Sequence, residues 1–339
     1  MVALLIALLL LGLLVIPVAQ VIFVAFQDPA TGAATLQNFA DFFATSLFRE
    51  SFWNSFYVSA MSVVVATIIA LPLAYITTRF HFSGSILIQS LGFIPLIMPP
   101  FVGAVAMQLI FGRNGTINLL LRDYFGFTIP FMDGLNGVIL VQSIHYFPFI
   151  LINLSASLRN IDRSMEEAAQ NLGSHGLRLF RRIVFPLAMP GYIAGAALVF
   201  IKVFDDLGTP LLLNVNNMLA PQAFLRISSI GISDPMGYVI SCILVVFSVL
   251  SLWASFLVMR GKEYATVQKG GGGTAKRELK SSEKVLAYGV VIFILLVVLS
   301  PHLGLLLLSL GTIWSFAPLP DAYTLQNYAT MLEGSKTYI

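Results

Sequence analysis

Seven stretches of the chain are long, apolar and free of Lys, Arg, Asp and Glu, and they limit its possible folds severely. A helix needs about 20 apolar residues to cross the hydrocarbon core of a membrane. In lipid the backbone polar groups can be satisfied only within helices or closed barrels. The sequence therefore predicts an all-α fold, a polytopic transmembrane helical bundle. Its spans are residues 2–26, 51–78, 82–112, 134–158, 183–201, 235–259 and 285–320.

Composition excludes an ordinary soluble domain, because 58% of the residues are hydrophobic, only 10% are charged and the mean hydropathy is +0.88. The first run is interpreted as an anchor helix and not a signal peptide, since no basic residue precedes it and no small-residue cleavage site follows it. The single cysteine, Cys242, lies in the sixth run, where packing is its expected role.

The positions of Lys and Arg predict the orientation. With the amino terminus inside, the inner segments carry 13 of these residues and the outer segments carry 5. The positive-inside rule then places the amino terminus and the 159–189 loop in the cytoplasm. This topology accounts for the basic residues, so the net charge of +3 gives no reason to expect a nucleic-acid partner.

The loop between the fourth and fifth spans is a polar interruption rich in small residues. Ser164 and Glu167 have the spacing of a capping box, which predicts a helix that begins near Met165. Ala168 and Ala169 favour a helix and carry little side chain, so another protein surface can approach closely.

After that helix, Gly173 is suited to the left-handed conformation that ends a helix. A second short helix is expected from Gly176 until Pro186 stops it. The local pattern alone is equally typical of an ordinary pair of interfacial helices.

Glu167-Ala168-Ala169, then Gly173 after three residues, then Ile183 to Pro186 after nine more, resembles the signature loop of ATP-binding-cassette import permeases, with Phe185 where Leu is usual. The resemblance implies the type I importer permease fold. It also implies that cytoplasmic ATPase subunits dock on this loop and bind the ATP, that a periplasmic binding protein delivers substrate, and that this chain needs no cofactor of its own. The docking residues it implies are Glu166, Glu167, Ala168, Ala169, Gly173, Ile183 and Pro186.

The chain contains a short repeat. Residues 35–40 read Thr-Leu-Gln-Asn-Phe-Ala and follow the first span, and residues 324–329 read Thr-Leu-Gln-Asn-Tyr-Ala and follow the seventh. Chance recurrence is one explanation. The other is internal duplication, as in fused iron(III)-type permeases. Duplication predicts a first permease half of about six spans at 1–265, a flexible cytoplasmic linker at 266–284 and the start of an incomplete second half at 285–339, whose remainder lies on the same full-length chain or on another. The glycine run in the linker lacks the ending of a phosphate-binding loop, which favours a tether.

Lys202, Asp205 and Asp206 lie in the predicted fifth span, assigned here as residues 190–213. Ionisable groups in a membrane point to function by default. Two interpretations remain: a translocation path or gate, with carboxylates suited to a cation, or an internally neutralised ion pair, since Lys202 can reach both acids at helical spacing.

Three prolines at positions 95, 99 and 100 predict that the third span bends or unwinds. Phe93 and Met98 would then line a gate at the bend, or the bend is a fixed kink that fits the neighbouring helices. His145 in the fourth span faces the pore or makes a structural hydrogen bond. The histidines lie on separate segments with no metal-ligand spacing, and the identity of any metal is left open.

The resemblance and the repeat predict a permease of the bacterial inner membrane that moves a substrate, iron(III) before 2-aminoethylphosphonate, thiamine or a polyamine. An ion-coupled secondary transporter would carry coupling carboxylates in several spans, and the sequence has them in one. A membrane enzyme would need a catalytic set, and no such motif is present in the sequence. The expected partners are the ATPase, the binding protein, the second permease half and membrane lipid.

Overall fold

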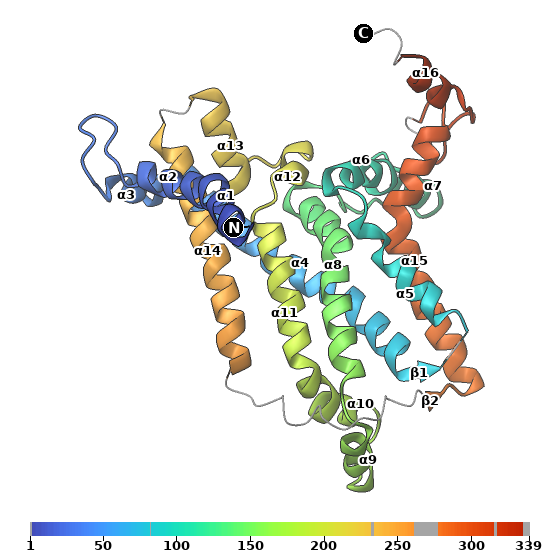
Figure 1. Cartoon of the computed structure of the whole chain (residues 1–339). Coiled ribbons are helices and arrows are strands. Elements are labelled where there is room, and N and C mark those ends of the chain that lie inside the picture. Colours follow the sequence, from blue (N-terminus) through green and yellow to red (C-terminus); the bar gives the residue numbers. More distant parts are fainter. Residues whose placement is uncertain (1, 82, 232–233, 261–276, 315–316, 335–339) are drawn as a thin grey trace.

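The computed structural model of this chain is a helical bundle (Figure 1). It describes residues 2–81, 83–231, 234–260, 277–314 and 317–334. Most of the predicted linker, residues 266–276, lies outside this set. The long helices are α4 (Ser46–Arg79), α8 (Gly134–Arg159), α11 (Phe185–Phe204), α14 (Pro235–Arg260) and α15 (Ser281–Leu310). Of these, α8, α11, α14 and α15 run roughly from top to bottom in Figure 1, whereas α4 crosses them obliquely.

Shorter elements connect the long helices or extend them. They are α1 (Val2–Leu10), α2 (Ile16–Ala25), α3 (Gln37–Ala44), α5 (Ser85–Phe93), α6 (Pro100–Phe111), α7 (Thr116–Phe125), α9 (Arg163–Asn171), α10 (Gly176–Leu179), α12 (Gly208–Leu212), α13 (Leu219–Ser229) and α16 (Gln326–Gly334). Strands β1 (Phe80–His81) and β2 (Arg277–Glu278) form one parallel pair, which attaches the last part of the predicted linker to the end of α4.

Six helical segments within the described residues are long and apolar enough to cross a membrane, and a bent helix pair makes a seventh candidate. These seven correspond to the seven apolar runs of the sequence. The bent pair, Ser85–Leu96 with Pro100–Phe125, turns by 103° at its break. Proline there removes backbone donors and clashes with the preceding turn, so the helix breaks where the sequence predicts it.

The bundle is centred on α8, which packs against both α4 and α11. Two glycines four residues apart on α11 allow its close contact with α8. A β-carbon built on Gly195 would lie 2.7 Å from the Cα of Ile150 and from the carbonyl oxygen of Phe149, and one on Gly191 would collide with Asn153 and Ser157. Small residues at this spacing let two membrane helices bring their backbones together.

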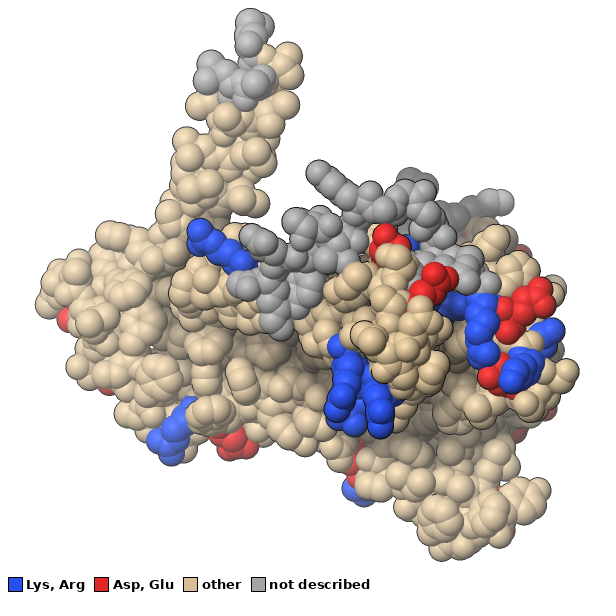
Figure 2. Space-filling model, turned by 90° about the horizontal axis from the view of Figure 1, so that it is seen from below, with Lys and Arg blue, Asp and Glu red and all other residues tan. Residues whose placement is uncertain are grey.

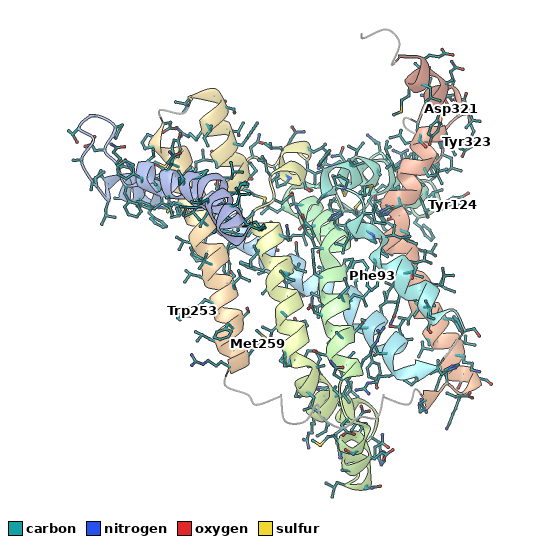
Figure 3. The ribbon with its side chains drawn as sticks, in the orientation of Figure 1. Phe93, Tyr124, Trp253, Met259, Asp321 and Tyr323 are labelled. Carbon is teal, nitrogen blue, oxygen red and sulfur yellow. The ribbon has the colours of Figure 1, made fainter. Side chains whose placement is uncertain are left out.

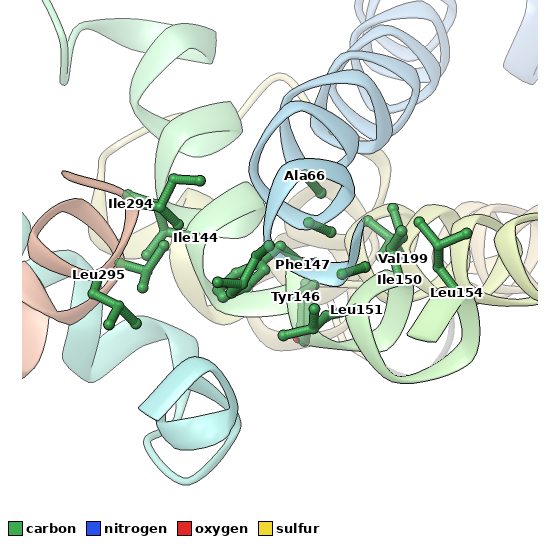
Figure 4. Close-up of a cluster of buried hydrophobic side chains, with 14 of the residues drawn as sticks. Ala66, Ile144, Tyr146, Phe147, Ile150, Leu151, Leu154, Val199, Ile294 and Leu295 are labelled. Carbon is green, nitrogen blue, oxygen red and sulfur yellow. The ribbon is translucent and has the colours of Figure 1, made fainter. Parts of the chain in front are cut away.

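Large apolar side chains fill the space around this contact (Figure 4). Phe147, Ile150 and Leu154 of α8 are fully or almost fully buried, and they meet Ala66 of α4 and Val199 of α11. Lipid tails are as apolar as these side chains, so tight packing stabilises the bundle more than removal from water does.

Helices α1 and α2 project from the bundle. They lie across the direction of the long helices in Figure 1 and form the apolar column in Figure 2. Most of their residues are exposed, and α2 contacts α14 near its end.

The two copies of the repeat adopt the same local structure. The side-chain amide of Asn38 donates to the carbonyl oxygens of Ala25 and Gln27 at 3.1 and 2.9 Å, and that of Asn327 donates to those of Ser309 and Gly311 at 3.0 and 3.0 Å. In each copy the threonine hydroxyl also accepts from the amide two residues later, at 3.0 Å. Each asparagine therefore ties the end of an apolar helix, α2 or α15, to the turn that follows. The division of the chain into halves stays a prediction.

The helix contact gives a direct test. Gly195→Val would force α8 and α11 apart, and overpacking of this kind costs about 1–3 kcal/mol. We expect a clearly lower midpoint of thermal unfolding for the detergent-purified chain. Gly289→Val on α15 is the matched control, because no atom lies within 4 Å of a β-carbon there. Equal midpoints for the two variants would contradict the proposed role of this contact.

Candidate functional site

The candidate coupling loop connects α8 to α11 and consists of residues 160–184. It lies at the end of the bundle that also holds β1, β2 and the start of α15 (Figure 1). Helix α9 reaches furthest from the bundle, and α10 lies between it and α11. The loop is therefore both the connection between two packed helices and a projecting surface.

The cap of α9 differs from the sequence prediction. The helix begins at Arg163, and the carboxylate of Asp162 accepts a hydrogen bond of 2.9 Å from the backbone amide of Ser164. The predicted capping box of Ser164 and Glu167 is therefore wrong. Asp162 has the extended backbone of an N-cap residue, and aspartate is among the best capping residues. The helix therefore begins directly after Asp162, and Ser164 lies inside its first turn.

The end of α9 agrees with the prediction. Gly173 has φ of 84°, which is the left-handed conformation. Its amide donates to the carbonyl oxygen of Gln170 at 2.9 Å, and the amide of Ser174 donates to that of Ala169 at 2.9 Å. This pair of hydrogen bonds is a Schellman motif, which satisfies the last carbonyl groups of the helix and turns the chain sharply.

The second half of the loop corrects another prediction. Pro186 does not end a helix: α10 continues through a π-helical turn, Phe180–Val184, into α11, and Pro186 is the second residue of α11. Proline is tolerated there because the wider turn before it changes the local hydrogen-bond register. Ile183 and Pro186 are partly buried within this continuous helix and lie outside the projecting tip.

An ion pair fixes α9 to the bundle. The guanidinium of Arg79, the last residue of α4, lies 2.6 Å from the carboxylate of Glu166. Only 9% and 17% of these two side chains are exposed. The contact joins the loop to a helix that is not its neighbour in sequence, and no pattern in the sequence predicts it.

The two alanines of the signature lie in different surroundings. Ala169 is 8% exposed and packs within the chain, whereas Ala168 and Glu167 are on the exposed side of α9. Leu172 at the tip is 89% exposed. Sequence reasoning missed Leu172, although a leucine next to a helix-ending glycine in a polar loop was a usable signal.

The polar residues of the fifth span lie at and beyond its end. Helix α11 stops at Phe204, so the predicted continuation to residue 213 is wrong. Asp205 accepts from the Ser248 hydroxyl at 2.9 Å, and Asp206 accepts from the side-chain amide of Gln142 and from the backbone amide of Thr209. Lys202 is exposed, and no ion pair joins it to either acid in the described part of the chain. The acids therefore connect α11 to α8, α12 and α14.

The structure brings Met98, one of the two residues assigned to the gate at the bend, together with His145 of the fourth span. Met98 and His145 are buried and line a cavity of about 10 Å³ with Pro95 and His302. Phe93 is partly buried and packs against the main core at mid-height of the bundle, outside the residues that line this cavity (Figure 3). This volume holds at most one water molecule, so the cavity is no open path for a substrate in the state described.

A family model described as "Binding-protein-dependent transport system inner membrane component" matches residues 62–263, which is more than half of the chain. The chain belongs to this family. The match includes the whole coupling loop and confirms the resemblance drawn from the signature residues. The family consists of transport components, in agreement with the expectation that this permease is not an enzyme.

Curated relatives agree with this assignment. The permease is 26% identical over 243 residues to the ferric transport system permease protein FbpB of Actinobacillus pleuropneumoniae, covering 71% of this chain and 35% of the relative. It is 34% identical over 157 residues to the molybdenum transport system permease protein ModB of Haemophilus influenzae, covering 45% of this chain and 68% of the relative. The chain spans about a third of the length of the ferric relatives it matches.

The fold also matches solved structures. A bacterial transporter involved in the import of the acidic polysaccharide alginate aligns with a TM-score of 0.58 at 15% identity, over 78% of this chain and 93% of that one. The same kind of transporter in complex with a periplasmic protein bound to an alginate pentasaccharide gives a TM-score of 0.57 at 16% identity, over 80% and 95%. The predicted all-α type I importer fold is therefore confirmed.

The ion pair between α4 and α9 can be tested by a double-mutant cycle. Breaking a buried pair by removing one partner leaves an uncompensated charge and costs about 3–5 kcal/mol. We expect Arg79→Gln and Glu166→Gln each to lower the unfolding midpoint. The double variant should lose less stability than the sum of the two single losses. Strictly additive losses would show that the two charges do not act on each other.

Proposed function

We propose that this chain is the membrane permease of an ATP-driven importer in the bacterial inner membrane, and that its coupling loop receives the force from a separate ATPase. The observation that carries the proposal is the projecting helix α9, which is fixed to the bundle by Arg79 and Glu166 and presents an exposed leucine at its tip. A single exposed leucine is ordinary on a protein surface, but this one lies at the tip of a projecting helix, where a groove on a partner would bury it.

Charge distribution supports a cytoplasmic position for this loop. Arg79, the loop arginines, and Arg277 and Lys280 before α15 all lie at one end of the bundle. With this end in the cytoplasm, the opposite end faces the periplasm, where a binding protein would deliver the substrate.

The mechanism follows from the attachments of the loop. Closure of two ATPase subunits on ATP would draw two such loops together, one from each permease half. Because the loop is continuous with α8 and α11 and is paired with α4, its displacement would move these helices together. ATP binding would thus shift the population from an inward-open to an outward-open state.

For the substrate we propose iron(III). The ferric relatives align with 71% and 70% of this chain and are much longer than it, as the predicted two-half organisation requires. Relatives named for molybdenum, sulfate and 2-aminoethylphosphonate transport define the competing substrates.

Docking can be tested by co-purification. Leu172→Glu places a charge where an apolar contact is proposed and is expected to release the ATPase while the permease stays in the membrane. Gly173→Pro should do the same, because φ of 84° is closed to proline. The control is Leu36→Glu, since Leu36 is 69% exposed and lies at the opposite end of the bundle. Full ATPase retention by both loop variants, with normal uptake, would refute docking at this tip. A secondary transporter or a membrane enzyme would bring down no ATPase even as wild type.

Substrate choice needs an uptake measurement in cells that lack their own iron importers and express the complete system. We expect radioactive iron(III) to accumulate, and molybdate, sulfate and 2-aminoethylphosphonate to leave its uptake unchanged as competitors. Accumulation of one of these anions in place of iron would reject the iron assignment and leave the importer mechanism intact.

A further inference from the structure

A second surface on the same end of the chain is formed by arginines. Leu177, Arg178, Arg181 and Arg182 line a groove of about 470 Å³ where α10 passes into the π-helical turn before α11. The arginines are spaced i, i+3 and i+4, so they share one face of the helix. Lys and Arg side chains also stand out in blue on the face of the molecule shown in Figure 2.

These three arginines have no acidic partner among the described residues. Arg79, Arg113 and Arg277 each lie within 3.0 Å of a carboxylate, but no such pair involves Arg178, Arg181 or Arg182. Like charges at this spacing on one helix face destabilise it. An anion from outside the chain would remove that repulsion, and a guanidinium binds phosphate oxygens with two parallel hydrogen bonds.

The position of the groove identifies the anion. The apolar span begins at residue 183, immediately after the arginines, so the groove lies where the membrane surface meets water. Leu177, which is 70% exposed, adds an apolar side chain to the same groove. Helix α9, the element that projects towards a soluble partner, lies beyond α10 on the side away from the bundle (Figure 1).

We propose that this groove binds the phosphate headgroup of an anionic phospholipid, with an acyl chain lying against Leu177 and the start of α11. Basic pockets beside membrane helices on the cytoplasmic side bind such headgroups. The bound lipid would neutralise the three arginines and hold the base of the coupling loop at the membrane surface. This inference requires that α11 crosses the membrane with this end in the cytoplasm, and it is independent of the ATPase and of the substrate.

The test is a native mass spectrometry titration of the purified full chain with dioleoyl phosphatidylglycerol and, separately, with dioleoyl phosphatidylcholine. We expect the wild type to prefer the anionic lipid. The variant Arg181→Gln/Arg182→Gln should bind it about 25-fold more weakly, because each basic residue near a membrane surface contributes roughly fivefold. Arg181→Lys/Arg182→Lys should retain most of the preference, since the charge remains.

The matched control is Arg260→Gln/Lys284→Gln, which removes the same charge from two exposed side chains on the same end of the bundle. We expect it to change binding by less than about twofold, because neither side chain is among the residues that line the groove. Unchanged unfolding midpoints will show that all variants are folded. The proposal is overturned if the wild type does not prefer phosphatidylglycerol, or if the control pair loses as much affinity as the groove pair. It is also overturned if millimolar inorganic phosphate displaces the lipid, which indicates a site for free phosphate. A groove variant that keeps its lipid in this titration and loses the ATPase in the co-purification assay would overturn it too, because that result indicates a protein interface.

Discussion

The backbone contact between α8 and α11 determines how the coupling loop is held at one end of the bundle, the end that we propose to be cytoplasmic. Gly191 and Gly195 bring the two helices so close that larger residues cannot be accommodated. Since the coupling loop begins at the end of α8 and finishes at the start of α11, this contact sets the distance that the loop must bridge. A loop anchored at two tightly packed points can carry force, because displacing its tip must move the helices as well.

The ion pair between Arg79 and Glu166 adds a third anchor. Arg79 lies on α4, a helix far from the loop in sequence. Because the two side chains are largely buried, separating their charges costs free energy. The tip beyond these anchors has few contacts with the chain, as the exposure of Leu172 shows. The loop thus combines a firmly held base with a free outer surface, which is the arrangement that a docking element requires. The arginine groove lies at the same base, so a lipid there would act on the anchored part and not on the tip.

Sequence patterns predicted most of this fold, because lipid allows few alternatives. The seven apolar runs correspond to the seven candidate spans, and the prolines at 95, 99 and 100 mark the 103° break. The left-handed conformation of Gly173 was predictable, because it depends on the local sequence at the end of a helix and not on a distant contact. Contacts between distant segments were not predictable in this way. The choice of Asp162 over Ser164 as the cap, the pairing of Arg79 with Glu166 and the hydrogen bond of Asp206 with Gln142 depend on which backbones come together. Helical spacing predicted that Lys202 would pair with Asp205 and Asp206. Both carboxylates instead accept hydrogen bonds from donors on other helices.

The repeat links the break in the third span to the predicted second half. Asn327 ties the end of α15 to its following turn by the same bonds with which Asn38 ties the end of α2. In the predicted duplication, α15 would be the counterpart of the first span. It packs on α6, and its Pro301 and His302 line the small cavity beside Pro95 and Met98. A β-carbon on Gly304 of α15 would lie 2.8 Å from the side chain of Ile110, so this contact too depends on a missing side chain. The first helix after the predicted linker is thus packed against the least regular part of the predicted first half. A movement of α15 or of α6 would change the packing at the bend, where the backbone already departs from a straight helix.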